Sequence, residues 1–270
     1  MNAALPSWRH RSLAAMRLGE IAALPDKAIT PVILTTAAIE QHGPHLPVGM
    51  DAMLAQAWLD LALPLLADDV PCLVAPPITV GKSNEHTGFA GTLSIGKELL
   101  AGLIRSIAAQ LETWGFRHLL VLNTHGGNIQ VVRSCLREIQ AGTKLHTALL
   151  KPSFTPPASD HEQAHGFHAG QVETAWMLAL TPGLVKADLA NREYPATASS
   201  AGELRAEAAP AIFSWITSDL STSGTIGDAT LATAGDGHAW LEAGSRALAE
   251  SIAEFAKWAA LENAKDSLKP

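Results

Sequence analysis

The sequence has few charged residues, one tyrosine, two cysteines and no long hydrophobic run. Charged residues make up 17% of the 270 positions, whereas soluble domains typically have about 25%. Cys72 and Cys135 lie in apolar surroundings without a C-x-x-C motif, which argues against a disulfide framework and favours a reducing cytoplasm. No stretch approaches the roughly 18 consecutive apolar residues of a transmembrane helix, so we expect no membrane partner.

The sequence also lacks basic clusters. Lysine and arginine number 19 against 26 acidic residues, which gives a net charge of −7 at pH 7. Phosphate contacts require clustered positive charge, so we expect no nucleic-acid partner. No uninterrupted apolar segment follows Arg9 and Arg11, so the chain is not expected to carry a signal peptide. The hydrophobic fraction of 47% argues against disorder, and residues 1–270 are treated as one cytoplasmic domain.

Eleven histidines stand out in this composition, and histidine is the commonest metal ligand. Hydrophobic patterning indicates which elements precede them. Short apolar runs predict strands at residues 31–38, 71–78, 117–123 and 145–151. Longer amphipathic or apolar runs predict helices at residues 51–66, 96–114, 129–140, 169–180 and 240–264.

Strands that alternate with helices predict an α/β fold with a mostly parallel sheet covered on both faces. Ligands of such sheets bind beyond the carboxyl ends of the strands. The segments that follow the predicted strands are residues 39–51, 79–92, 123–128 and 152–168. Seven of the eleven histidines lie in them, namely His42, His45, His86, His125, His161, His165 and His168.

The first of these segments contains Glu40 and His42, with Asp51 at the start of the next helix. A carboxylate and an imidazole two residues apart at a strand end point the same way. Glutamate, histidine and aspartate together offer the mixed oxygen and nitrogen ligands that suit Zn²⁺, Mn²⁺ or Fe²⁺. The alternative is a capped loop in which the Asp51 charge favours the helix dipole.

Two further segments place histidines beside turns or helix starts. His125 directly follows a predicted strand and precedes two glycines, which indicates either another imidazole ligand or a glycine-rich turn. His168 and Glu173 flank a helix start. Glu173 is a candidate metal ligand and catalytic residue, and His168 is a candidate acid or base. Alternatively, Glu173 complements the helix dipole and His168 is a side chain of the N-cap region.

Residues 81–92 form a polar, glycine-punctuated segment. We expect Ser83, Glu85 and His86 to line a substrate pocket together with Phe167. The alternative is an ordinary surface loop.

Four motifs in these segments resemble the creatininase, or creatinine amidohydrolase, family. They are E-Q-H-G-P-H-L-P-x-G-x-D at 40–51, S-x-E-H-x-x-F-x-G-T-L-S at 83–94, N-T-H-G-G-N at 123–128 and H-A-G-x-x-E-T at 168–174. They occur in the family's order. The resemblance implies a three-layer α/β/α sandwich and a cytosolic hydrolase of a non-peptide C–N bond in a small cyclic amide or formamide. It also implies two divalent metal ions per subunit (Zn, Mn or Fe) and a homo-oligomer, commonly a hexamer.

Matched motif by motif, the resemblance assigns metal ligation to Glu40, His42, Asp51 and His125 and proton transfer to His168. It implies that Asp51 bridges the two ions. Two alternatives come from other classes of function. The same metal pair could serve an isomerase or a hydrolase of a C–C or ester bond, or the fold could serve a non-catalytic small-molecule binder.

The chain also departs from the family pattern. Enzymes that act on creatinine carry a ligating glutamate two residues after the histidine of the third motif, where this chain has Gly127. Glu173 is the available substitute. Those enzymes also stack creatinine on tryptophans, and residues 152–167 contain none. The resemblance therefore does not extend to creatinine as the substrate.

Overall fold

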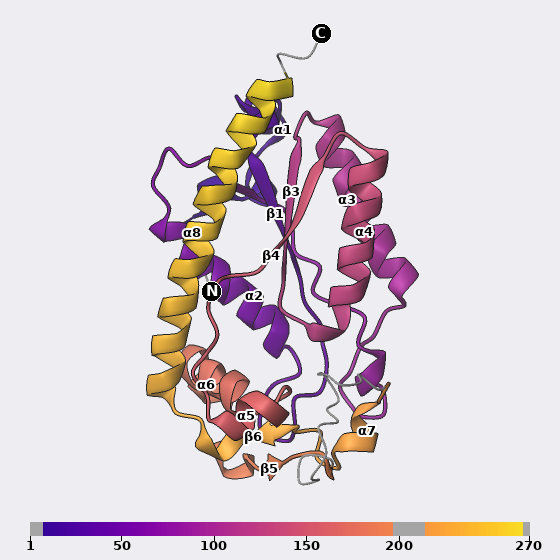
Figure 1. The fold of residues 1–270 in the computed structure, drawn as a ribbon, viewed down its shortest axis with the longest axis vertical. Coiled ribbons are helices and arrows are strands. Elements are labelled where there is room, and N and C mark those ends of the chain that lie inside the picture. Colours follow the sequence, from indigo (N-terminus) through magenta and orange to yellow (C-terminus); the bar gives the residue numbers. More distant parts are fainter. Residues whose placement is uncertain (1–7, 197–213, 267–270) are drawn as a thin grey trace.

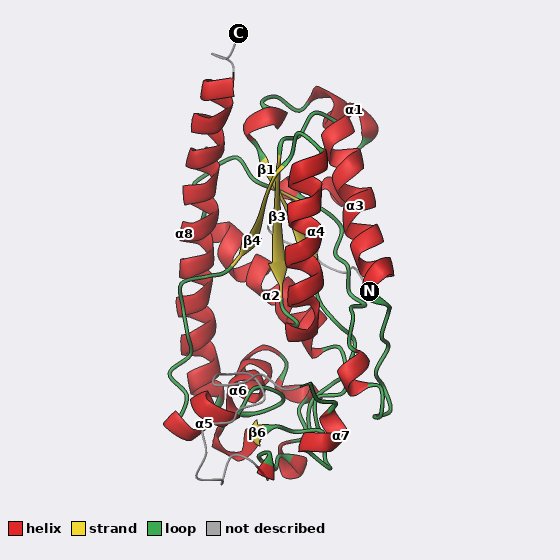
Figure 2. Ribbon diagram, turned by 45° about the vertical axis from the view of Figure 1, so that its right-hand side comes forward, coloured by secondary structure: helices red, strands yellow, loops and turns green. Residues whose placement is uncertain are grey.

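The computed structural model describes residues 8–196 and 214–266. Its centre is a parallel sheet in the order β2–β1–β3–β4 (Figure 1). The strands are β1 (Pro31–Thr36), β2 (Leu73–Val74), β3 (His118–Asn123) and β4 (His146–Leu150). One face is covered by α3 (Lys97–Thr113) and α4 (Ile129–Gly142), and the other by α2 (Met50–Ala62) and α8 (Ala234–Asp266) (Figure 2). The predicted α/β fold with a three-layer arrangement is confirmed.

Smaller elements gather beyond the carboxyl ends of the strands, at the lower end of the molecule in Figure 1. They are α5 (Asp160–His165), α6 (Gln171–Leu180), α7 (Thr217–Leu220) and the antiparallel pair β5 (Arg192–Glu193) and β6 (Gly227–Asp228). The short helix α1 (Leu18–Ala23) lies at the opposite end. Within the described ranges, no helix has both the length and the apolar character needed to cross a membrane.

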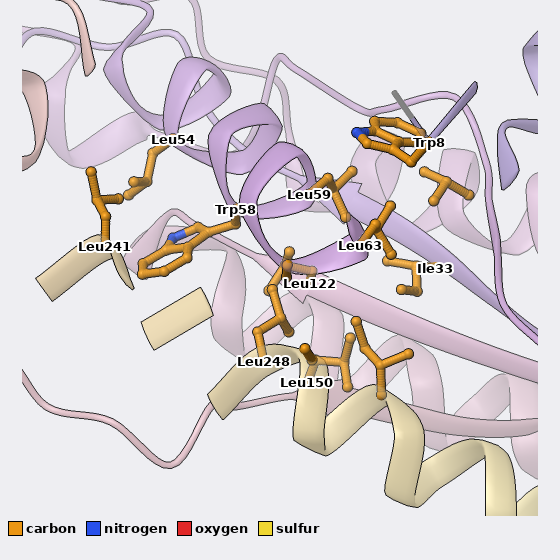
Figure 3. Packing of buried hydrophobic residues seen from close by; sticks show 14 of the residues in the cluster. Trp8, Ile33, Leu54, Trp58, Leu59, Leu63, Leu122, Leu150, Leu241 and Leu248 are labelled. Carbon is orange, nitrogen blue, oxygen red and sulfur yellow. The ribbon is translucent and has the colours of Figure 1, made fainter. Parts of the chain in front are cut away.

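Alternating strand residues build a separate apolar layer on each face of the sheet, because successive side chains of a strand point to opposite faces. Ile33 and Leu122 belong to one layer, together with Trp58 of α2 and Leu248 of α8 (Figure 3). Val32 belongs to the other layer, which is completed by apolar side chains of α3 and α4. The two layers fix the strands, and the residues that follow the strands are positioned with them.

The strand predicted at 71–78 is much shorter in the structure. Only Leu73–Val74 pairs as a regular strand with β1, and Ile78 returns through an isolated bridge to Thr36. Pro76 and Pro77 intervene, and proline has no N–H to donate to a sheet. Prolines are tolerated there because β2 is an edge strand.

Two predicted helix boundaries are also wrong. Helix α2 ends at Ala62 rather than at residue 66, and a 3₁₀ turn that contains Pro64 follows it. Helix α8 begins at Ala234 rather than at residue 240. Gly235 and Gly237 made the earlier start hard to predict, because glycine disfavours helices.

Gly237 allows α8 to approach α6 closely. A Cβ atom at this position would lie 1.9 Å from the backbone oxygen of Ala175. We therefore expect Gly237→Ala to lower the free energy of unfolding by about 1–3 kcal/mol, as overpacking does. Urea denaturation measures the change. Gly235→Ala is the matched control, since its Cβ would meet only Thr233 Oγ1 at 3.7 Å. Equal stability of the two variants would contradict the prediction.

Candidate metal centre

Five of the residues predicted from the sequence converge at the carboxyl ends of β1 and β3. Glu40 and His42 follow β1, His125 follows β3, and Asp51 lies in the first turn of α2. Glu173 arrives from the first turn of α6. The first four side chains are almost completely buried, and the parallel register of β1 and β3 brings the segments together.

Asp51 divides the acidic and imidazole groups into two sets. Potential ligand atoms of Glu40, Asp51 and His125 lie within 4.8 Å of one another, and the same holds for His42, Asp51 and Glu173. Asp51 Oδ2 lies 3.3 Å from His125 Nδ1, whereas Asp51 Oδ1 lies 3.5 Å from His42 Nε2. The two oxygens of one carboxylate therefore face two different imidazoles, as a bridging ligand requires.

Backbone carbonyls determine which nitrogen of each imidazole faces the centre. A carbonyl oxygen only accepts hydrogen bonds, so the nitrogen beside it must carry the proton. His42 Nδ1 donates to the Glu40 carbonyl at 3.1 Å, and His125 Nε2 donates to the Lys82 carbonyl at 2.9 Å. The opposite nitrogens, His42 Nε2 and His125 Nδ1, point toward the carboxylates and leave their lone pairs available to a metal ion in the neutral state.

Two atoms in this centre are buried without a hydrogen-bond partner among the described residues. They are His42 Nε2 and Asp51 Oδ2. Buried polar atoms are nearly always satisfied in native proteins, and a cation between an imidazole lone pair and a carboxylate would satisfy both. Together with the donor set of two imidazoles and three carboxylates, these orphaned atoms fit divalent metal ions.

Without an ion, the carboxylates attract protons onto the imidazoles. Burial alone would lower the pKa of His42, but the adjacent Asp51 carboxylate, with the charges of Glu173 and Glu40, raises it to about 9. Burial opposes protonation of His125 as well, yet the adjacent carboxylates of Asp51, Glu40 and Glu85 raise its pKa to about 12. Burial raises the pKa of Glu173 to about 7; the His42 charge opposes this shift and the Asp51 charge adds to it.

These shifts predict that metal uptake releases protons. At pH 7.5 the ion-free centre holds protons on His42 and His125, because both pKa values lie above that pH. Ligating imidazoles and carboxylates must be deprotonated, so uptake of two ions should release two protons from the imidazoles and a fraction of one from Glu173, and affinity should rise from pH 6 to pH 9. Calorimetry in buffers of different ionisation enthalpy measures the release. Uptake without proton release would contradict the prediction.

His168 is held in a different state. Its Nε2 donates to the Gln41 carbonyl at 2.8 Å, and its Nδ1 lies 3.8 Å from Glu40 Oε1. The ring lies between His42 and His86, with centroid distances of 4.4 and 4.2 Å. Burial and then the charges of His42 and His86 keep the pKa of His168 well below its usual value. His168 is therefore neutral, with a free Nδ1 lone pair beside the centre.

The centre opens into a cavity of about 580 Å³. Glu85, His86 and Phe167, three of the four residues predicted to bind substrate, line its wall. Ser83 is fully buried, and the structure places it behind Glu40 rather than on this wall, where its hydroxyl donates to Glu40 Oε2. Ser83 thus orients a candidate metal ligand.

Sequence reasoning missed Trp215, which also lines the cavity. Its ring lies 5.4 Å from the ring of Phe167 and 6.5 Å from that of His86. Trp215 precedes α7 and lies far along the chain from the four motifs, so no local pattern indicated it. His45, another histidine of the segment after β1, is buried outside the cavity wall and shares a hydrogen bond with Thr174 Oγ1.

Comparison with known proteins shows the family of this chain. A sequence profile of the creatininase (creatinine amidohydrolase) family matches residues 14–252. The chain belongs to the creatininase family. Its relatives in this family are hydrolases named as amidohydrolases and peptidases, so the chain is a creatininase-family hydrolase.

Individual creatininase relatives differ in what they cleave. A mycofactocin precursor peptide peptidase of Mycobacterium ulcerans (strain Agy99) is 33% identical over 211 residues, which are 76% of this chain and 78% of that protein. A creatinine amidohydrolase of Pseudomonas putida is 30% identical over 186 residues, 62% of this chain and 70% of that protein. A solved creatininase variant described as Zn–Zn type superimposes with a TM-score of 0.70 at 25% identity, covering 90% of this chain and 97% of that one.

Proposed function

We propose that this creatininase-family chain hydrolyses the C–N bond of a small amide with water, using two divalent metal ions per subunit. The observation that carries the proposal is the placement of Asp51, whose two oxygens face His42 and His125 separately. Glu40 and His125 would hold one ion and His42 and Glu173 the other, with Asp51 shared. The donor set suits Zn, Mn or Fe.

Bound ions would polarise the amide carbonyl and lower the pKa of a water toward neutrality. The protein's own groups would then manage the protons. His168 presents a free Nδ1 at the centre and can accept a proton and pass it to the leaving nitrogen. Glu173 would act there as a ligand, because a bound ion would displace the proton that its raised pKa of about 7 lets it hold in the ion-free centre.

The cavity wall supports a substrate with a flat or apolar part. Phe167 and Trp215 face this space as an aromatic pair, and the ion pair of Lys82 with Glu85 lies on the same wall. A cyclic amide or a formamide is our first candidate. A peptide bond is the second, because the mycofactocin precursor peptide peptidase is 33% identical to this chain.

Product analysis tests the proposal. Purified protein loaded with zinc or manganese is incubated with cyclic amides, formamides, short peptides, esters and diketones, and metal content is measured alongside. We expect two ions per chain and conversion of the amide bond into an amine and a carboxylate, which stay on one product when a cyclic amide is opened. Turnover of esters or diketones alone, or isomerisation, would favour the rival enzyme classes. Tight binding of a test compound without turnover would favour a binding protein.

Oligomeric state and location stay predictions. The family resemblance implies a homo-oligomer, commonly a hexamer, and a cytoplasmic location. Light scattering coupled to size-exclusion chromatography tests the first, and fractionation of the source cells tests the second.

A further inference from the structure

Among the described residues that line the cavity, Glu85 is the one carboxylate outside the candidate ligand groups, which are the two that share Asp51 and a third made of Glu40, His42 and His168. It lies in the short 3₁₀ turn Asn84–His86, and its side chain is mostly buried. Its Oε1 lies 3.4 Å from His125 Nε2, and its Oε2 lies 2.8 Å from the ammonium of Lys82. Glu85 therefore contacts a candidate metal ligand from the side that faces away from the ions.

The two nitrogens of His125 have separate partners. Nδ1 faces Glu40 Oε1 at 3.2 Å and Asp51 Oδ2 at 3.3 Å, where an ion would bind. Nε2 donates its proton to the Lys82 carbonyl at 2.9 Å, with the Glu85 carboxylate beside it. A carboxylate beside the N–H of a ligating histidine fixes the tautomer and increases the basicity of the other nitrogen.

Gly127 provides the space that Glu85 occupies. A Cβ atom at position 127 would lie 1.9 Å from Glu85 Oε1, 2.5 Å from His125 Nε2 and 2.7 Å from the Lys82 carbonyl oxygen. Any side chain at 127 would collide with the contacts that hold His125. The glycine of the N-T-H-G-G-N motif and the carboxylate of the 83–86 segment thus form one complementary arrangement, although 42 positions separate them.

We infer that Glu85 is a positioning residue, whose carboxylate lies beside the His125 Nε2–H that the Lys82 carbonyl accepts and whose charge thereby strengthens metal binding by His125 Nδ1. The inference rests on the proposed metal site. It assigns Glu85 to the support of His125 in place of the direct substrate contact expected from the sequence. Lys82 contributes twice, because its carbonyl accepts from His125 and its ammonium neutralises Glu85.

The test measures metal affinity in a background with one site. Glu173→Gln removes a ligand of the His42 site and leaves the Glu40–Asp51–His125 site. Adding Glu85→Gln to that variant should weaken zinc binding about 10- to 100-fold, as losses of outer partners typically do. Competition with a chromogenic chelator measures the affinity without any need for turnover. Glu98→Gln is the matched control, since Glu98 is an exposed glutamate on α3.

The outcomes separate the inference from the proposed function. The positioning role would be overturned if adding Glu85→Gln to the Glu173→Gln variant changed neither the zinc affinity nor the thermal unfolding measured with a chelator present. A wild-type chain that binds no divalent ion would overturn both. A wild-type chain that binds two ions but hydrolyses no amide would overturn the proposed reaction alone, while weaker zinc binding by the double variant would still support the role of Glu85.

Discussion

Asp51→Asn should remove most of the activity and at least one of the two metal ions. Its oxygens face the imidazoles of both candidate sites, and an amide offers one neutral acceptor oxygen in place of two charged ones. Metal ions contribute several kcal/mol of transition-state stabilisation, and about 1.4 kcal/mol corresponds to a tenfold rate change. We therefore expect kcat/KM to fall roughly 10³-fold or more.

Metal analysis after gel filtration and steady-state kinetics check this prediction together. Asp68→Asn provides the control, because Asp68 is an exposed aspartate that follows α2 and lies outside the candidate ligand groups. Circular dichroism verifies that both variants fold. Retention of two tightly bound ions by Asp51→Asn would show that this carboxylate does not bridge.

His168→Ala should lower kcat by about 10²–10⁴-fold, the usual contribution of a general acid–base group, and should leave two ions bound. The neutral ring offers Nδ1 toward the centre while its N–H is anchored on the Gln41 carbonyl. Metal ligation by His168 is also possible, because Glu40, His42 and His168 form a candidate ligand group. Proton transfer and ligation predict different metal contents for this variant.

Metal content distinguishes these two roles of His168. A variant that loses an ion along with its activity would identify His168 as a ligand, against our assignment. His238→Ala is the control, since His238 is an exposed histidine near the start of α8. Activity of His168→Ala within a few fold of wild type would contradict both roles.

The strands and helices that position the site were largely predictable, because they depend on local hydrophobic patterning. Strands β1 and β3 and helices α3 and α4 lie within a few residues of their expected bounds. Edge strand β2 and the start of α8 were not, because pairing at a sheet edge and the close contact of Gly237 with α6 are long-range effects.

The sequence by itself determined which side chains reach the carboxyl ends of the strands: Glu40, His42, Asp51, His125 and Glu173. Their positions after strands or in helix first turns are local properties of the chain. Only the tertiary structure decided how they face one another. It showed that carbonyls of Glu40 and Lys82 orient the imidazoles. It also brought Trp215 to the cavity wall and the Glu85 carboxylate next to Gly127. Such contacts between distant segments depend on how the whole chain packs, so the local sequence does not predict them.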